Sequence, residues 1–424
     1  MSITAVVGGN WGDEGKGKIT DLLAKQSDFV VRFQGGNNAG HTIINDYGKF
    51  QLHLLPSGVF NPNTVNVLAT SVAVNIEAFL TEYRDVISRN VPKPNIKISH
   101  RAQVVLPHHI LLDKLEEKRL GKDQFGSTQS GMAPFYSDKY LKIGIQVADL
   151  YDYDALLNKV IRNIEKKNIL LEHLYNHKAL NAIEITDYLF EQGKSIECFV
   201  DDTRKLLKNA IKDKNILMEG QLGALKDPDH GIYPMTTSSS PLASFAPVST
   251  GLPASELKRV ITVVKSYSSA VGSGPFVSEI FGDAGDTLRI NGGDAGEFGA
   301  TTGRPRRMGW FDAVASRYGC ELQGTTEVVL SLLDVLGYLD EIPVCTHYEI
   351  DGNRCDVFPV NSELEKAKPV FKVLKGWKSD ISNIRNFKEL PLEAKEYVNF
   401  VEELLGFPIT LISVGPKRDD IIMK

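Results

Sequence analysis

Cysteine is scarce in this sequence and long apolar runs are absent. The four cysteines among 424 residues are scattered and show no metal-ligand spacing. Cys345 and Cys355 could form a disulfide, but free thiols in a reducing compartment are the favoured interpretation. No eighteen apolar residues are consecutive, and Gly8 and Gly9 interrupt the only early apolar run. We therefore expect a cytoplasmic protein without a secretory segment or a membrane partner.

An excess of positive charge is also lacking. The chain has 48 Lys and Arg against 53 Asp and Glu, for a formal net charge of -5. This balance gives no electrostatic reason to expect nucleic acid or an anionic membrane as a partner. An anionic small molecule would have to be bound by local basic clusters, so such clusters become informative.

What the chain does contain is a series of short apolar runs, each followed by a polar or glycine-rich turn. They predict buried strands of a largely parallel sheet at 3–8, 29–33, 65–70, 216–219, 260–264, 328–333 and 409–414. Such sheets bind ligands outside the carboxyl ends of their strands. Internal repeats and low-complexity linkers are absent. We expect one α/β domain over 1–424, with a mostly parallel central sheet and helical insertions.

Two segments differ from this pattern. Residues 145–215 are almost free of glycine, and Leu156, Val160 and Ile164 recur at helical spacing, which predicts a helical insertion. Residues 272–309 contain ten glycines and show little periodicity. We interpret them as a long functional and mobile loop.

The most informative segment is 8–18, GGNWGDEGKGK, between an apolar run and a helical pattern. Strand, glycine loop and helix form a cradle for phosphates. The spacing from Gly12 to Gly17 and Lys18 fits GxxxxGK, but Ile19 occupies the position of the Mg²⁺-binding hydroxyl. Asp13, inside the loop, would repel a polyphosphate unless it held a metal ion or accepted a proton. This predicts a chemical role for Asp13.

A second candidate site is Gln34–Thr42, QGGNNAGHT, which follows the strand expected at 29–33. Taken alone, His41 could be a histidine satisfied by local backbone groups. Together with Asp13 on a neighbouring strand end, it provides the acid and base that proton transfer requires.

Three further segments are candidates for anion binding. The hydroxyl-rich segments 126–131 and 236–240 could surround a phosphate or be solvated turns. Segment 299–307 carries Arg304, Arg306 and Arg307 within four positions, and arginine forks bind carboxylate or phosphate in pairs of hydrogen bonds. Asp334 follows another apolar strand, where a carboxylate could accept from the two N–H donors of a guanine.

WGDEGKGK, NAGHT, DPDHG with a following YP, GEFGATTGRPRR and SVGP occur in this order from about Val6 to Arg418. With these motifs the chain resembles the adenylosuccinate synthetase family. The resemblance implies a GTP-dependent carbon–nitrogen ligase of purine biosynthesis, which joins L-aspartate to IMP. The products are adenylosuccinate, GDP and phosphate, formed through a 6-phosphoryl-IMP intermediate in the first committed step of AMP synthesis. It also implies a homodimer.

The resemblance implies roles for single residues. Asp13 would be the base that removes the N1 proton of IMP, and His41 would stabilise the phosphoryl group in transfer. Lys16 would support the phosphates, and Mg²⁺ would be held by Asp13 and the carbonyl of Gly40.

The resemblance also implies the binding residues. Implied contacts to IMP and aspartate are Asn38, Thr128, Lys142, Gln221, Thr237, Val271, Thr301, Thr302, Arg304 and Arg306. Implied contacts to GTP are Gly12, Gly15, Lys16, Gly17, Gly40, Thr42, Asp334, Ser413 and Gly415. Of these, Lys142 would reach the IMP phosphate of a neighbouring subunit.

Departures from the family pattern gather at the purine and monophosphate end. Segment 126–131 lacks an arginine, Lys142 replaces an arginine, and Leu222 stands where a glutamine faces the purine. Leu332 replaces a lysine beside the guanine-reading aspartate.

Two alternatives therefore stay open. One is a relative acting on another 6-oxopurine monophosphate such as (d)GMP, as in phage diaminopurine synthesis. The other is a non-catalytic nucleotide-binding regulator, which the retention of Asp13 and His41 disfavours.

Overall fold

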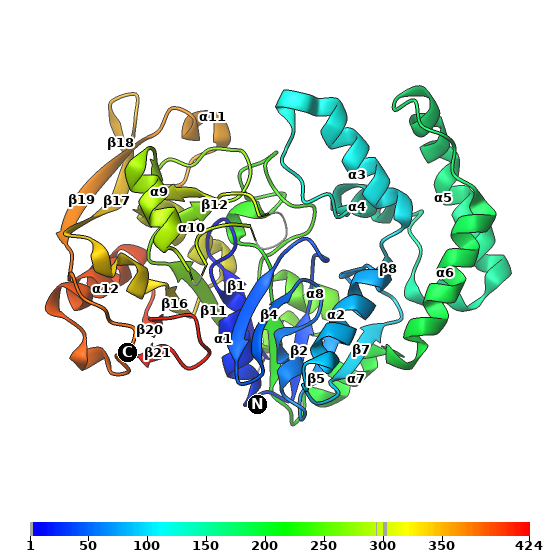
Figure 1. The fold of residues 1–424 in the computed structure, drawn as a ribbon, viewed down its shortest axis with the longest axis horizontal. Helices are drawn as coiled ribbons and strands as arrows, with labels where there is room; N and C mark the ends of the chain where they lie inside the picture. The colour runs from blue at the N-terminus through cyan, green and yellow to red at the C-terminus, as the bar shows by residue number, and fades with distance from the viewer. Residues whose placement is uncertain (1–2, 294, 300–302) are drawn as a thin grey trace.

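The computed structural model describes residues 3–293, 295–299 and 303–424. Its centre is a ten-stranded sheet in the order β21-β20-β16-β11-β1-β10-β2-β5-β7-β9 (Figure 1). Every neighbouring pair is parallel except β20 and β21. The strands are β1 Ile3–Gly8, β2 Phe29–Arg32, β5 Val65–Leu68, β7 Asn95–Ser99, β9 Val200–Asp201, β10 Ile216–Glu219, β11 Leu257–Lys265, β16 Glu327–Ser331, β20 Ile409–Ser413 and β21 Ile421–Met423.

The expected fold class is confirmed, because all seven predicted strands lie in this sheet. The inner strands are readable in the sequence because both of their faces are covered, so their residues form continuous apolar runs. In β1, for example, Ala5, Val6 and Val7 are fully buried. The sequence did not reveal β7, which alternates polar and apolar residues, or the short edge strands β9 and β21.

Helices and smaller sheets surround the central sheet. The helices are α1 Lys16–Ala24, α2 Ile76–Ser88, α3 Pro107–Leu120, α4 Met132–Tyr140, α5 Tyr153–His173, α6 Ala182–Ile196, α7 Thr203–Ala210, α8 Phe245–Thr250, α9 Asp283–Asn291, α10 Ala313–Gln323, α11 Asn361–Leu364 and α12 Leu392–Leu405. The remaining strands are β3 His41–Asn45, β4 Gly48–Leu52, β6 Ala73–Val74, β8 Gln103–Val104, β12 Ser268–Ala270, β13 Glu279–Ile280, β14 Arg307–Gly309, β15 Phe311–Asp312, β17 Glu341–Ile350, β18 Asn353–Cys355 and β19 Lys368–Lys375. In Figure 1, α5 and α6 lie at one end of the molecule and β17, β18 and β19 at the other.

The segment 145–215 contains the two long helices α5 and α6. It also contributes β9 to the edge of the central sheet, where β9 pairs with β7. Its bounds as an insertion stay a prediction.

The interpretation of 272–309 as a loop is wrong in part, because this segment contains α9 and the strands β13 and β14. Helix α9 buries only Gly285 and Leu288, which explains why it has no apolar periodicity. Its N-terminus is recognisable instead by Asp283 and Asp286 in the first turn, where acidic side chains interact favourably with the helix dipole.

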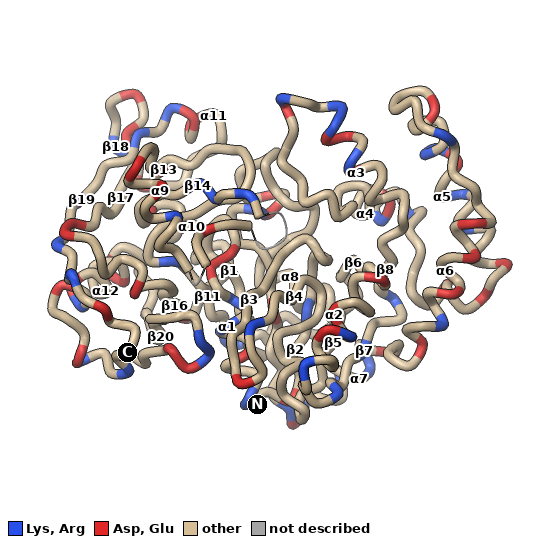
Figure 2. Tube along the Cα trace, viewed as in Figure 1, with Lys and Arg blue, Asp and Glu red and all other residues tan. Residues whose placement is uncertain are grey.

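Two expectations drawn from scarcity can be compared with the structure. All four cysteines are free thiols, so Cys345 and Cys355 do not form a disulfide. Across the described ranges, no helix has both the length and the apolar character needed to cross a membrane. Figure 2 shows basic and acidic residues interspersed along the trace.

Candidate active site

The glycine loop joins the end of β1 to the start of α1, at the centre of the sheet. Three of its residues have left-handed backbone angles: Gly12 (φ 105), Asp13 (φ 60) and Gly15 (φ 91). For a residue with a Cβ atom this conformation is strained, and such strain is found where surrounding structure holds a side chain for a purpose. Asp13 is one of nine described non-glycine residues in this conformation.

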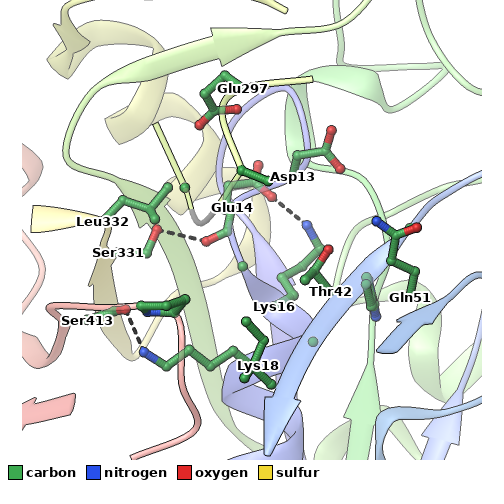
Figure 3. A pocket seen from close by; sticks show the side chains of 18 of the residues that line it. Asp13, Glu14, Lys16, Lys18, Thr42, Gln51, Glu297, Ser331, Leu332 and Ser413 are labelled. Atoms are coloured by element: carbon green, nitrogen blue, oxygen red, sulfur yellow. Dashed lines mark hydrogen bonds and ion pairs between the residues drawn. The ribbon is translucent and has the colours of Figure 1, made fainter. Parts of the chain in front are cut away.

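Glu14 gives the loop its shape. Its Oε1 atom accepts from the backbone N–H groups of Asn10 at 3.1 Å and Gly12 at 2.9 Å, and its carboxylate forms a buried ion pair with Lys16. Its carbonyl accepts from the Ser331 hydroxyl at 2.7 Å (Figure 3). Glu14 therefore supports the loop, while the neighbouring Asp13 is partly exposed.

Two cavities meet at this loop. The smaller, of about 250 Å³, is lined by Gly15, Lys16, Gly17, Thr42, Ser413 and Gly415 among others. The larger, of about 1050 Å³, is lined by Gly12, Asn38, Thr128, Thr237 and Val271 among others. Asp13 and Gly40 line both cavities. The structure thus brings together most of the residues expected to bind two nucleotides and places Asp13 between the two groups.

His41 is the first residue of β3 and lines the smaller cavity. Its Nδ1 atom lies 2.6 Å from Oε1 of Glu219, which also accepts from the hydroxyl of Ser57. Its Nε2 atom is buried and has no hydrogen-bond partner among the described residues. Burial lowers the pKa of His41, while the Glu219 carboxylate opposes this shift. The arrangement orients the ring and leaves Nε2 available to a ligand.

Asp13 and Arg306 form an ion pair, with Nη2 of Arg306 2.9 Å from Oδ2 of Asp13. Arg306 also pairs with buried Glu297, which lies 2.8 Å from the ammonium of Lys265. Burial alone would raise the pKa of Glu297, but the charges of Lys265 and Arg306 outweigh burial and lower that pKa to about 2. This chain of charges positions Arg306 against Asp13. The Nε atom of Arg306 is buried without a partner in the described part of the chain.

Lys18 connects the loop to the C-terminal strands. Its ammonium donates to the Ser413 hydroxyl at 2.8 Å and to the carbonyls of Gly415 at 2.8 Å and Asp420 at 2.9 Å. Figure 3 shows the Lys18 side chain reaching Ser413. Burial lowers the pKa of Lys18 to about 8, although Asp420 and Asp334 oppose the shift.

Asp334 follows β16 and Leu332 (φ 62), but it does not line the smaller cavity as Leu332 does. Burial raises the pKa of Asp334 to about 6. Its Oδ1 atom is buried and unpartnered within the described residues. A carboxylate oxygen in this state is available to accept from N–H donors of a ligand.

Some expected substrate residues lie elsewhere. Gln221 is buried and donates to Oδ1 of Asn38 at 2.9 Å, whereas Leu222 lines both cavities. Lys142 is exposed, has a left-handed backbone angle (φ 63) and lines neither cavity. Arg304 donates to the carbonyls of Gly126 at 2.8 Å and Ser127 at 3.2 Å. Thr301 and Thr302 lie outside the described residues.

Sequence reasoning missed Glu219, Glu297 and Lys265 as supporting residues. Glu219 and Lys265 are the last residues of the buried strands β10 and β11. A charged residue that ends an apolar run at the carboxyl edge of a parallel sheet is a signal that could have been used. Glu297 lies in the glycine-rich segment and carries no comparable signal.

The residues around Asp13 can be tested for their fit to Mg²⁺. This ion prefers oxygen ligands from one or two carboxylates, with phosphates and water completing an octahedron. Asp13 offers a carboxylate that is 25% exposed, and Gly40, beside it in both cavities, has a backbone carbonyl. The donor chemistry fits this ion.

Comparisons with known proteins agree with this geometry. The adenylosuccinate synthetase family profile matches residues 5–422. The adenylosuccinate synthetase of Dehalococcoides mccartyi is 43% identical over 426 residues, covering 100% of both chains. That of Mycobacterium marinum is 44% identical over 427 residues, covering 100% of this chain and 98% of its own.

Solved structures give the same picture. The fully ligated adenylosuccinate synthetase of Plasmodium falciparum superimposes with a TM-score of 0.92 at 33% identity, with full coverage of both chains. The succinoaminodeoxyadenylate synthetase of cyanophage S-2L, bound to dGMP and dATP, reaches a TM-score of 0.61 at 17% identity, covering 100% of this chain and 95% of its own. The latter likeness concerns the fold alone. The chain belongs to the adenylosuccinate synthetase family.

Proposed function

We propose that this protein ligates L-aspartate to IMP at the expense of GTP, giving adenylosuccinate, GDP and phosphate. The observation that carries the proposal is the position of Asp13, which lies where the two cavities meet. GTP would occupy the smaller cavity, beside the glycine loop and Ser413. IMP would occupy the larger one, beside Asn38, Thr128 and Thr237.

The first step is phosphoryl transfer to the purine oxygen. A C6–O bond of a hydroxypurine does not break without activation, so O6 must be phosphorylated first. Asp13 removes the N1 proton of IMP, and O6 then attacks the γ-phosphorus of GTP, with GDP leaving. His41, with a proton on each ring nitrogen, donates from Nδ1 to Glu219 and from Nε2 to the phosphoryl oxygens during transfer. Proton transfer of this kind contributes about 10²–10⁴-fold in rate.

The second step forms the carbon–nitrogen bond. The amino group of aspartate attacks C6 of 6-phosphoryl-IMP, and phosphate leaves with the former O6 and with the proton that the nitrogen loses. Arg304, with the neighbouring residues Thr301 and Thr302, receives aspartate. Mg²⁺, held by Asp13 and the Gly40 carbonyl together with phosphate oxygens, would neutralise charge on the triphosphate. Arg306, now paired with Asp13, would turn to an incoming anion.

A substrate panel tests the proposal. Purified protein is mixed with Mg²⁺, aspartate and either GTP or ATP, and phosphate release is measured on adding IMP, dIMP, GMP or dGMP. We expect release that requires both IMP and aspartate. Nucleotide binding without aspartate-dependent phosphate release would instead support a non-catalytic regulator.

A second substrate class has one observation in its favour. Leu222 lines both cavities, whereas the neighbouring Gln221 turns to Asn38 and Arg32. The purine end thus has an apolar side chain in place of an amide. A leucine forms no hydrogen bonds and cannot distinguish the donors and acceptors of different purines. Turnover with GMP or dGMP but not IMP would favour this alternative.

We further propose a homodimer in which Lys142 reaches the monophosphate of the partner subunit. The exposed, left-handed position of Lys142 supports this role. Sedimentation equilibrium should give twice the 46.8 kDa chain mass, and a monomer at working concentration would contradict it. Cytoplasmic location stays a prediction.

A further inference from the structure

The larger cavity contains a lysine with no role in the chemistry described above. Lys226 follows the loop after β10 and lines this cavity with Thr236, Thr237 and Ser238. The backbone N–H of Thr237 donates to the carbonyl of Lys226 at 2.9 Å. Lys226 and the hydroxyl-rich segment 236–238 therefore form one wall of the cavity.

The ammonium of Lys226 is short of partners. It donates to the carbonyl of Met235 at 3.0 Å, and no described carboxylate lies within ion-pair distance. An ammonium has three N–H donors, so one bond to a neutral oxygen leaves two available. The adjacent acid, Asp227, does not serve it. That carboxylate accepts from the N–H groups of Asp229 and His230 and from the Ser240 hydroxyl.

Lys226 is half-buried, and the described lysines that are buried more deeply differ from it. Lys16, Lys167 and Lys265 each form an ion pair with a carboxylate, and Lys18 donates to three oxygens. A cation that is partly removed from water without a counter-charge lowers the stability of the fold. Burial and the nearby charge of Arg307 lower the pKa of Lys226 to about 8, so the ammonium is still largely charged at neutral pH. A lysine in this state is better explained by binding an anionic ligand than by a contribution to stability.

The other charges of the cavity narrow the choice of ligand. Of its described lining residues, the remaining cations are Arg162, Lys166 and Lys167, all on α5. Lys226 is therefore the cation beside the hydroxyl groups, and hydroxyls with an ammonium form a binding site for a phosphate group.

We propose that Lys226 binds the 5′-phosphate of the purine nucleoside monophosphate, together with the hydroxyl groups of segment 236–238. The assignment rests on the proposed function, in which this nucleotide occupies the larger cavity. Lys226 would thus supply, from within the chain, positive charge to the monophosphate end.

Binding measurements on Lys226→Met test the proposal, because methionine keeps the apolar stem and removes the charge. We expect the Kd of IMP, measured by calorimetry, to rise about 10–100-fold, since a charge-assisted hydrogen bond contributes this much. The Kd of inosine, which lacks the phosphate, should stay unchanged. Lys226→Arg should keep IMP affinity within a few-fold, and Lys212→Met, at an exposed position, should bind IMP like the unmodified protein.

Two further readouts separate binding from folding and from the proposed reaction. Without nucleotide, Lys226→Met should unfold at the same temperature as the unmodified protein or higher, because an uncompensated charge is gone. Three results would overturn the assignment. Lys226→Met could bind IMP as tightly as the unmodified protein, or the Kd of inosine could rise as much as the Kd of IMP. The third is a rise in the KM of aspartate alone. A tenfold loss of IMP affinity in a protein that releases no phosphate would support Lys226 while contradicting the proposed reaction.

Discussion

At the scale of single residues, Asp13 is fixed in position but remains accessible to a ligand. Its left-handed backbone is stabilised by Glu14, whose carboxylate accepts hydrogen bonds from two N–H groups of the loop. Its own carboxylate is partly exposed and paired with Arg306. Asp13 therefore contributes little to the core. The strain of its left-handed backbone is explained by its position between two cavities.

Replacing Asp13 by alanine tests this division. We expect Asp13→Ala to lower aspartate-dependent phosphate release by about 10²–10⁴-fold, the contribution of a general base. Its thermal unfolding should match that of the unmodified protein. Asp213→Ala, which removes an exposed acid from a turn, is the matched control and should keep full activity. A folded Asp13→Ala protein with a near-normal rate would refute the role of Asp13 as base.

Asp334 gives a pH prediction. Because burial raises its pKa to about 6, the carboxylate is ionised above that pH and protonated below it. Only the ionised group accepts from both N–H donors of guanine, so the KM of GTP should rise as pH falls from 6 to 5. At pH 7 to 8 it should be constant. Asp334→Asn should remove this dependence, and an unchanged KM of GTP between pH 5 and 8 would contradict the assignment.

At the scale of elements, a buried network joins three helices beside the larger cavity. Asp138 on α4 lies 3.0 Å from Nε2 of His109 on α3 and pairs with Lys167 on α5. Asn163 of α5 also donates to Asp138, at 2.8 Å. His108, His109 and Asp138 are close enough to hold a metal ion. Because the ammonium of Lys167 already occupies Asp138, we interpret the cluster as a structural network.

Removing the charge of Asp138 should destabilise this region. We expect Asp138→Asn to lower the free energy of unfolding by about 3–5 kcal/mol, because it leaves the buried cation Lys167 without its partner. Urea unfolding measures this loss. Glu191→Gln, which breaks an exposed ion pair on α6, should change stability by about 0.5 kcal/mol at most. Equal stability of the two variants would contradict the interpretation.

The elements also show which parts of the fold the sequence could predict. Buried parallel strands were recognised because burial on both faces makes them continuous apolar runs. Helix α9 was missed because it packs only Leu288 and Gly285 into the interior. Strand β9 was missed because two residues carry no periodicity. Prediction succeeded where an element's own burial determines its sequence and failed where neighbouring elements hold it.

At the scale of the whole molecule, the sequence located the site but not its internal contacts. The motifs around Asp13, His41 and Ser413 could be assigned to strand ends, where a parallel sheet binds ligands. The partners of these residues are distant in sequence. Glu219 meets His41 across 178 positions, and no local pattern reports such a pair. The same holds for Gln221, whose amide turns to Asn38 instead of lining a cavity.

The central claim is that the protein transfers a phosphoryl group to the purine O6 before aspartate displaces it. The most direct test uses IMP labelled with ¹⁸O at position 6, with GTP, Mg²⁺ and aspartate, and analyses the released phosphate by mass spectrometry. We expect each phosphate to carry one ¹⁸O atom, because the former O6 leaves with it. Release of unlabelled phosphate while adenylosuccinate forms would contradict this account.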